Sequence, residues 1–267
     1  MALQLAAFMS GGSSSLRVFD LVINSEDRVN YLTTTTTNFR INLANPINQR
    51  IVGYGLKSAV IPRSLYNIPV IRNTFTFFDG VANYTVTVPA GNYTMTELLT
   101  QIQTLLNALG PNTFTLTYSN LSGKTTWTTT GPPMIINPTL DTSQGSILYK
   151  LGFLPGVAYT GVNITSPNVA DITGIKTAFI KIKQLTQYIR NTTNSMMNFK
   201  VDLDGQFGDI IFYADENKYH QYFNIAQDHL TNQGFYDVTL VDEYGIPIDL
   251  NGRDWSFVIQ FITADSY

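Results

Sequence analysis

The stretch "YDVTLVDEYGIPIDLNGRDWSFVIQFI", residues 236–262, decides the fold class. Its two ends alternate apolar and polar residues, which is the pattern of half-buried β-strands. Gly, Pro and Asn residues at positions 245–252 separate the two runs, and these residue types favour turns. In the second run, large apolar residues at every other position share one face of the strand. These residues are Trp255, Phe257, Ile259 and Phe261. The stretch therefore predicts two strands joined by a turn-rich connection.

The same stretch contains a group of charged residues that resembles an acid–base active site. The group consists of Asp242, Glu243, Asp249, Asp254 and Arg253, next to Trp255. A glycosidase needs two facing carboxyl groups about 5 to 10 Å apart, one of them with a raised pKa. Asp and Asn in such a connection also favour turns, because they hydrogen-bond their own backbone. We therefore favour a structural connection and predict that the chain is not an enzyme and has no catalytic residue.

An alternation with a period of two continues through most of the chain. Strands are predicted at residues 18–24, 38–44, 73–79, 83–89, 112–120, 124–130, 177–185, 197–203, 209–214, 236–242 and 255–262. The turn signals that separate them include Gly55, Pro62, Asp79-Gly80, Ser122-Gly123, Gly131-Pro132 and Asp204-Gly205. Many short strands at this spacing predict a sandwich or a jelly roll.

One amphipathic helix interrupts the strands, at residues 95–109. Its apolar residues fall on a single helical face, and they are Met95, Leu98, Leu99, Ile102, Leu105, Leu106 and Leu109. Thr94 and Glu97 have the spacing of a capping box, and Gly110-Pro111 ends the helix. The helix could bind a partner, but we predict that it packs on the chain's own sheet, since monomeric proteins rarely expose such a stripe.

The helix and a loop-rich stretch at 132–171 define the predicted domains. We predict an all-β chain: a single jelly-roll sandwich, residues 17–72 and 177–267, with an inserted or subsidiary β-rich unit, residues 73–176, that contains the helix. An N-terminal arm, residues 1–16, precedes the jelly roll.

The arm is apolar from Ala2 to Met9 and continues into Ser and Gly residues. A segment this small needs something to hold it in place. We predict that Leu3, Leu5 and Phe8 contact a neighbouring subunit. The alternative is that the arm folds back on its own domain.

Composition excludes several functional classes. Charged residues are 13% of the chain, about half of the ~25% that is typical of soluble domains. So few charges suit a subunit that is packed against neighbours on several sides. The net charge of -3 and the absence of a basic run argue against nucleic-acid binding. There is no cysteine, and the two histidines, His220 and His229, lack the spacing of metal ligands. We predict no metal, no cofactor and no membrane span.

Four motifs in one order carry a resemblance to a known family. They are "SAVIPRSLYNIPV" at 58–70, "YTVTVPAGNYTMTELLTQIQTLLNA" at 84–108, "YKLGF" at 149–153 and "IDLNGRDWSFVIQF" at 248–261. The chain resembles the penton, or minor capsid, proteins of virophages, Polinton-like viruses and related DNA viruses. The likeness runs from about Val18 to Phe261, and none of the motifs contains catalytic chemistry.

This resemblance implies a structural virion protein. Such a protein is a single vertical jelly roll, in some members with an insertion between strands. It forms a homopentamer that closes the vertices of an icosahedral capsid among hexameric double-jelly-roll major capsid proteins. The implied location is the virion capsid, after synthesis in the host cell cytoplasm. The alternative is a jelly-roll binding module that recognises glycans or a host receptor, which an exposed cluster of Trp or Tyr with Asp and Asn would favour.

Overall fold

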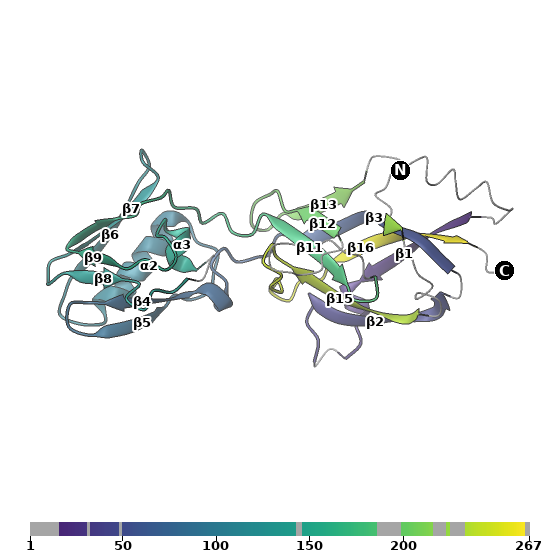
Figure 1. Ribbon diagram of the computed structural model, residues 1–267, viewed down its shortest axis with the longest axis horizontal. Helices are drawn as coiled ribbons and strands as arrows, with labels where there is room; N and C mark the ends of the chain where they lie inside the picture. The colour runs from purple at the N-terminus through teal and green to yellow at the C-terminus, as the bar shows by residue number, and fades with distance from the viewer. Residues whose placement is uncertain are drawn as a thin grey trace. The chain divides into compact units, whose positions relative to one another are not determined.

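The structure is a computed structural model, and it describes residues 16–30, 33–47, 50–142, 146–185, 199–215, 223–224 and 233–264 (Figure 1). Strands dominate it, in several antiparallel sheets. The chain divides into two compact units. Unit 1 consists of Met1–Ser64 and Ile175–Tyr267, and unit 2 consists of Leu65–Gly174.

Unit 1 contains two antiparallel sheets. The first has the order β1 (Leu16–Asn24), β16 (Ser256–Ala264), β3 (Arg50–Pro62) and β13 (Ile210–Ala214), and the short β14 (Phe223–Asn224) also pairs with β3. The second has the order β12 (Phe199–Asp202), β11 (Thr177–Ile182), β15 (Gln233–Val241) and β2 (Asn38–Ile47). The short 3-10 helix η1 (Ser25–Asp27) follows β1.

The strand order of these two sheets is that of a jelly roll. Counted along the chain without β14, the first sheet holds strands one, eight, three and six, and the second holds strands five, four, seven and two. Both sheets therefore combine early and late strands, as two interlocked Greek keys do. The predicted fold class is confirmed.

Aromatic rings fill the space between the two sheets of unit 1. Tyr54 lies edge-on to Phe199, with ring centroids 5.8 Å apart, and Tyr236 stacks on Phe261 at 6.3 Å. All four side chains are buried. The Tyr54 hydroxyl donates a 3.1 Å hydrogen bond to the Leu185 carbonyl, so its polar end is satisfied inside the sandwich. Burial of these rings on alternate positions is what fixes the register of each strand.

The longest described strand, β3, was missing from the prediction, and one of the predicted turn signals, Gly55, was wrong. Gly55 lies inside β3, opposite Gln260, and Pro62 lies at its end. Two register shifts interrupt the pairing of β3 with β16, close to Gly53 and Gly55. Glycine inside a strand commonly marks such a bulge. The glycines therefore accommodate bends in a continuous central strand and do not separate two strands.

Tyr236 provides a test of core packing in unit 1. In the described part of the chain, no hydrogen-bond partner lies within reach of its buried hydroxyl, and burial raises the pKa of Tyr236. We expect Tyr236→Phe to raise the free energy of unfolding by about 0.5 to 1 kcal/mol, because it removes an unpaired buried polar group. A tyrosine whose pKa is raised by folding loses stability as the pH rises above about 10. In thermal melts, the stability of Tyr236→Phe relative to wild type should therefore be larger at pH 10.5 than at pH 8. A variant that melts at a lower temperature than wild type at both pH values would contradict this expectation.

Unit 2 contains two smaller sheets and two helices. One sheet has the order β5 (Asn83–Thr87), β4 (Thr74–Phe78), β8 (Met134–Ile136) and β9 (Tyr159–Gly161). The other has the order β10 (Asn163–Thr165), β7 (Lys124–Thr129) and β6 (Phe114–Ser119). The helices are α2 (Met95–Asn107) and α3 (Ile147–Lys150), and a 3-10 helix, η2 (Val70–Arg72), precedes β4.

Helix α2 packs on its own unit, as predicted. Both hydrogen bonds of the Thr94–Glu97 capping box are present. Its buried residues are Leu98, Leu99, Ile102 and Leu106. The helix is joined to β6 by polar contacts as well, because the Leu116 amide donates to Gln103 Oε1 at 2.9 Å. Trp127 is fully buried in the same core, with its ring centroid 5.8 Å from that of Phe153.

The stretch at 132–171, predicted as loop-rich, contains β8, α3, β9 and β10. Each of these elements has only three or four residues. Such short elements contain too few residues to show a period of two or of 3.6. The chain that follows β10 is nevertheless hydrogen-bonded to the sheet, since the Ser166 amide donates to the Thr125 carbonyl at 2.8 Å.

Arg63 joins the two chain segments of unit 1 at the boundary with unit 2. Its Nη1 donates to the Ile175 carbonyl and its Nε to the Gly205 carbonyl, both at 2.9 Å. The next residue, Ser64, donates from Oγ to the Leu250 carbonyl at 2.6 Å. The segment that leaves the jelly roll after Ser64 is therefore held beside the segment that re-enters it at Ile175.

Candidate functional site

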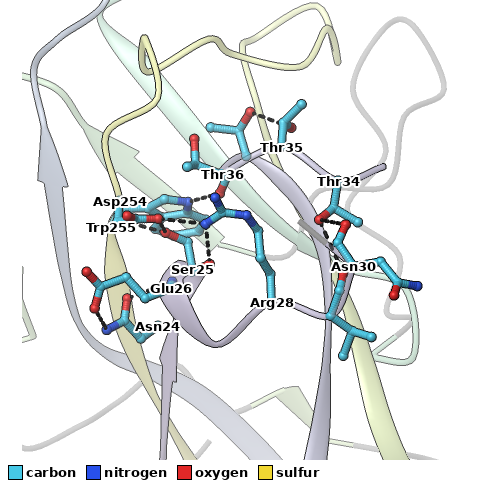
Figure 2. A network of polar contacts seen from close by, with 12 residues as sticks. Asn24, Ser25, Glu26, Arg28, Asn30, Thr34, Thr35, Thr36, Asp254 and Trp255 are labelled. Atoms are coloured by element: carbon cyan, nitrogen blue, oxygen red, sulfur yellow. Dashed lines mark hydrogen bonds and ion pairs between the residues drawn. The ribbon is translucent and has the colours of Figure 1, made fainter. Parts of the chain in front are cut away.

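One member of the charged group near Trp255, Asp254, belongs to a part-buried structural cluster at the start of β16 (Figure 2). Asp254 Oδ1 accepts hydrogen bonds from Ser25 Oγ at 2.7 Å and from Arg28 Nη1 at 2.9 Å. Arg28 Nη1 also donates to the Ser25 carbonyl at 2.8 Å. The Trp255 indole Nε1 donates to the Thr36 carbonyl at 2.7 Å. The cluster thus joins the segment after β1 to the segment before β16.

This cluster is unsuited to catalysis. Ser25 is 0% exposed, so its hydroxyl cannot meet a substrate. The same hydroxyl accepts a hydrogen bond from the Trp255 backbone amide at 3.0 Å and donates its own proton to Asp254. Its proton is therefore already used in a structural hydrogen bond. The two histidines, His220 and His229, lie outside the described residues.

The other carboxylates of the stretch form separate turns. Asp249 Oδ1 accepts the Asn251 amide at 2.8 Å. Asp242 is buried, and its Oδ1 accepts the amides of Tyr244 and Ile246, both at 2.9 Å. The turn interpretation is therefore right for Asp249 and Asp242. For Asp254 the interpretation as a local turn was wrong, since its partners lie 226 and 229 residues away in the sequence.

The outward faces of the two sheets of unit 1 differ in polarity. On the β12–β11–β15–β2 sheet, Arg40 forms a bidentate ion pair with Asp237, at 2.7 and 3.1 Å. The Arg40 hydrogen bond lowers the pKa of Asp237, and a hydrogen bond from Gln184 adds to this effect. Lys200 and Asp202 form a second ion pair on the edge strand, at 2.8 Å. This face is polar and suited to water.

The outward face of the β1–β16–β3–β13 sheet carries instead a group of apolar side chains, with the polar residues Asn24, Ser256 and Ser58 between them. We call this surface the apolar face, and it consists of Val22, Val258, Val60, Phe212 and Ile210. Paired residues on neighbouring strands point to the same side of a sheet, and the registers Val22↔Val258 and Val60↔Phe212 place these side chains together. Exposure is 66% for Val22, 56% for Ile210 and 74% for Phe212.

Few charges lie beside the apolar face. Asp20, on β1, accepts hydrogen bonds from Lys57 Nζ and, at 2.9 Å, from Gln260 Nε2. The two charges therefore neutralise each other within one pair. A large exposed apolar surface of this kind is typical of an interaction site. The predicted contact residues of the arm, Leu3, Leu5 and Phe8, lie outside the described residues.

Comparison with known proteins gives a likeness to a solved structure. The chain is similar to the mavirus penton protein in the crystal structure of its SeMet-labeled form. The match has 11% sequence identity and a TM-score of 0.44, and it covers 94% of this chain and 99% of that chain. No protein-family profile matches the sequence, and no curated protein matches it.

The described residues also bear on metal binding and on membrane-spanning helices. Among them, no three His, Cys, Asp or Glu side chains are grouped as a metal ion would require. Within the same residues, no helix has the length and apolar character needed to cross a membrane.

The sequence of β1 alone gives only a partial signal for the apolar face. In residues 18–24 the inward positions are Phe19, Leu21 and Ile23, but the outward positions also include Val18 and Val22. The other two outward positions are Asp20 and Asn24, so only half of the outward positions in residues 18–24 are apolar.

Proposed function

We propose that this chain is a structural subunit of an icosahedral capsid, a penton that closes the vertices as a homopentamer. The observation that carries the proposal is the jelly roll of unit 1, with one polar outward face and one exposed apolar face. A subunit that packs against other copies needs an apolar surface at the contact, where water is excluded, and a polar surface where it stays in water. The resemblance of the four sequence motifs to penton proteins supports the same conclusion.

In this proposal the chain acts through its rigid shape and not through a chemical reaction. The cluster of Ser25, Arg28 and Asp254 joins the two ends of the jelly roll, and the aromatic core fixes the two sheets. A subunit of this kind acts by presenting fixed surfaces to its neighbours. The partners in this proposal are further copies of the chain and a double-jelly-roll major capsid protein. The location is the virion capsid, after synthesis in the host cell cytoplasm.

The alternative of a glycan- or receptor-binding module has less support. Sugar-binding sites commonly stack an exposed aromatic ring on the ligand. Both tryptophans of the chain are buried, Trp127 at 0% and Trp255 at 3% exposure. Neither offers an indole face to a sugar.

The mass of the purified protein tests the proposal. We expect an assembly of about five times the 29.7 kDa chain, near 150 kDa, by light scattering coupled to size exclusion. The mass should fall toward that of one chain on dilution, as it does for any reversible assembly. A single chain at every concentration up to the solubility limit would contradict the homopentamer.

A further inference from the structure

We propose that the N-terminal segment of one copy, residues 1–9, docks on the apolar face of a neighbouring copy, with Phe8 against Phe212. The inference rests on the proposed function in one respect, because an assembly must supply the neighbour. It goes further by naming the two surfaces that meet.

The apolar face lacks a cover in the described part of the chain. Phe212 is 74% exposed although it sits in the middle of β13, and its cross-strand partner is Val60. Ile210 follows on the same side of β13 and pairs with Pro62. Strand interiors rarely leave such large apolar side chains in water, and their presence on one face indicates a partner.

The arm has the composition that this face requires. Of its first nine residues only Gln4 is polar, and no charged side chain precedes Arg17. A segment without charges can cover an apolar face without burying an unpaired charge. Ser and Gly residues at 10–15 follow it and can adopt many backbone conformations. The arm ends at Leu16, the first residue of β1, which is an edge strand of the same sheet.

Chain length argues that the arm comes from a neighbour. Phe212 lies in the row of Asn24, because Asn24 pairs with Ser256, Ser256 with Val60 and Val60 with Phe212. This row is eight residues along β1 from Leu16 and three strands across, so the separation is about 30 Å.

Phe8 precedes Leu16 by eight residues, which span at most about 28 Å when fully extended, so Phe8 of the same copy would reach this row only with an almost straight arm. The chain enters β1 at the end opposite this row, so Phe8 of the same copy would also have to turn back, which shortens its reach further. A neighbouring copy can place its own Phe8 on Phe212 without this restriction.

Engineered disulfides test the contact directly, because the chain has no native cysteine. Full-length Phe8→Cys and Phe212→Cys variants are made separately, mixed and oxidised. We expect a disulfide-linked pair of chains on a non-reducing gel, forming about tenfold faster than in a mixture of Phe8→Cys and Leu121→Cys. Leu121 is the matched control, since it is 99% exposed and lies in unit 2.

Two outcomes of this experiment would overturn the inference. Equal rates in the two mixtures would show that Phe8 has no preference for Phe212. A Phe8→Cys/Phe212→Cys double variant that closes its disulfide within one chain, at high dilution and as a monomer, would show that the arm folds back on its own domain.

Assembly measurements separate this inference from the proposed function. We expect Phe212→Ser, and deletion of residues 1–9, each to weaken assembly by about tenfold or more, since each removes the same buried apolar contact. The combined variant should be little worse than either one, and Leu121→Ser should assemble like wild type. The melting temperature of Phe212→Ser should stay near that of wild type because the side chain is exposed. If wild type forms the pentamer and both variants do so equally well, the docking inference fails and the penton proposal stands. If wild type is monomeric, the penton proposal itself fails.

Discussion

Replacing Trp255 with alanine should lower the free energy of unfolding by about 3 to 5 kcal/mol. The side chain is 3% exposed and stacks on Phe257, with ring centroids 5.0 Å apart, and it lies edge-on to Phe39 at 6.2 Å. Alanine would leave a cavity between β16 and β2 and would also leave the Thr36 carbonyl without its indole donor. Urea unfolding followed by tyrosine fluorescence would measure the loss.

Trp255→Phe is the matched control for this prediction. It keeps an aromatic ring beside Phe257 but removes the Nε1 donor, so we expect about half of the loss or less. A Trp255→Ala variant that unfolds at the same urea concentration as wild type would show that the packing around β16 does not stabilise the fold.

Asp254→Ala should lower the free energy of unfolding by about 2 to 3 kcal/mol. The change removes the acceptor of Ser25 Oγ and one hydrogen-bonded ion pair of Arg28, whose side chain is only 13% exposed. Asp254 itself is 33% exposed, so solvent screening keeps the cost below that of a fully buried ion pair. Asp254→Asn retains an acceptor oxygen and should cost about 1 kcal/mol.

The control for Asp254 is Asp249→Ala. Asp249 accepts only the local Asn251 amide among the hydrogen bonds of the described residues, and this bond is exposed. We expect it to cost about 1 kcal/mol or less. Thermal melts of the variants beside wild type rank these effects. Equal costs for the two alanine variants would contradict the long-range role of Asp254.

Local sequence patterns predicted much of the fold. The capping box of Thr94 and Glu97 and the apolar face of α2 were identified correctly because both depend on residues within a few positions of each other. The alternation in the last strand was also right, since Trp255, Phe257, Ile259 and Phe261 are all buried. Strand β3 was missed because its glycines have the local signature of a turn, and only its pairing with β16 and β13 makes it a strand.

The cluster around Asp254 depends on contacts that a single sequence does not contain. Nothing near Asp254 in the sequence indicates Ser25 or Arg28 as partners, because the jelly-roll topology brings the first and the last strands of unit 1 together. The apolar face has the same origin. Its residues come from β1, β3, β13 and β16, and each strand alone shows only one or two outward apolar side chains.

The contacts of Arg63 have a consequence for the evolution of this protein. The Arg63 guanidinium group binds the Ile175 carbonyl, so a residue just before the start of unit 2 is hydrogen-bonded to the residue that follows its end. This contact lies within unit 1 and involves no residue of unit 2. The entropy cost of a connection grows slowly with its length, by about 0.6 kcal/mol for each doubling. By this argument, a change in the length of the chain between Ser64 and Ile175 should have little effect on the stability of the sandwich. We therefore expect this junction to be a place where related chains differ in the inserted unit while the jelly roll stays the same.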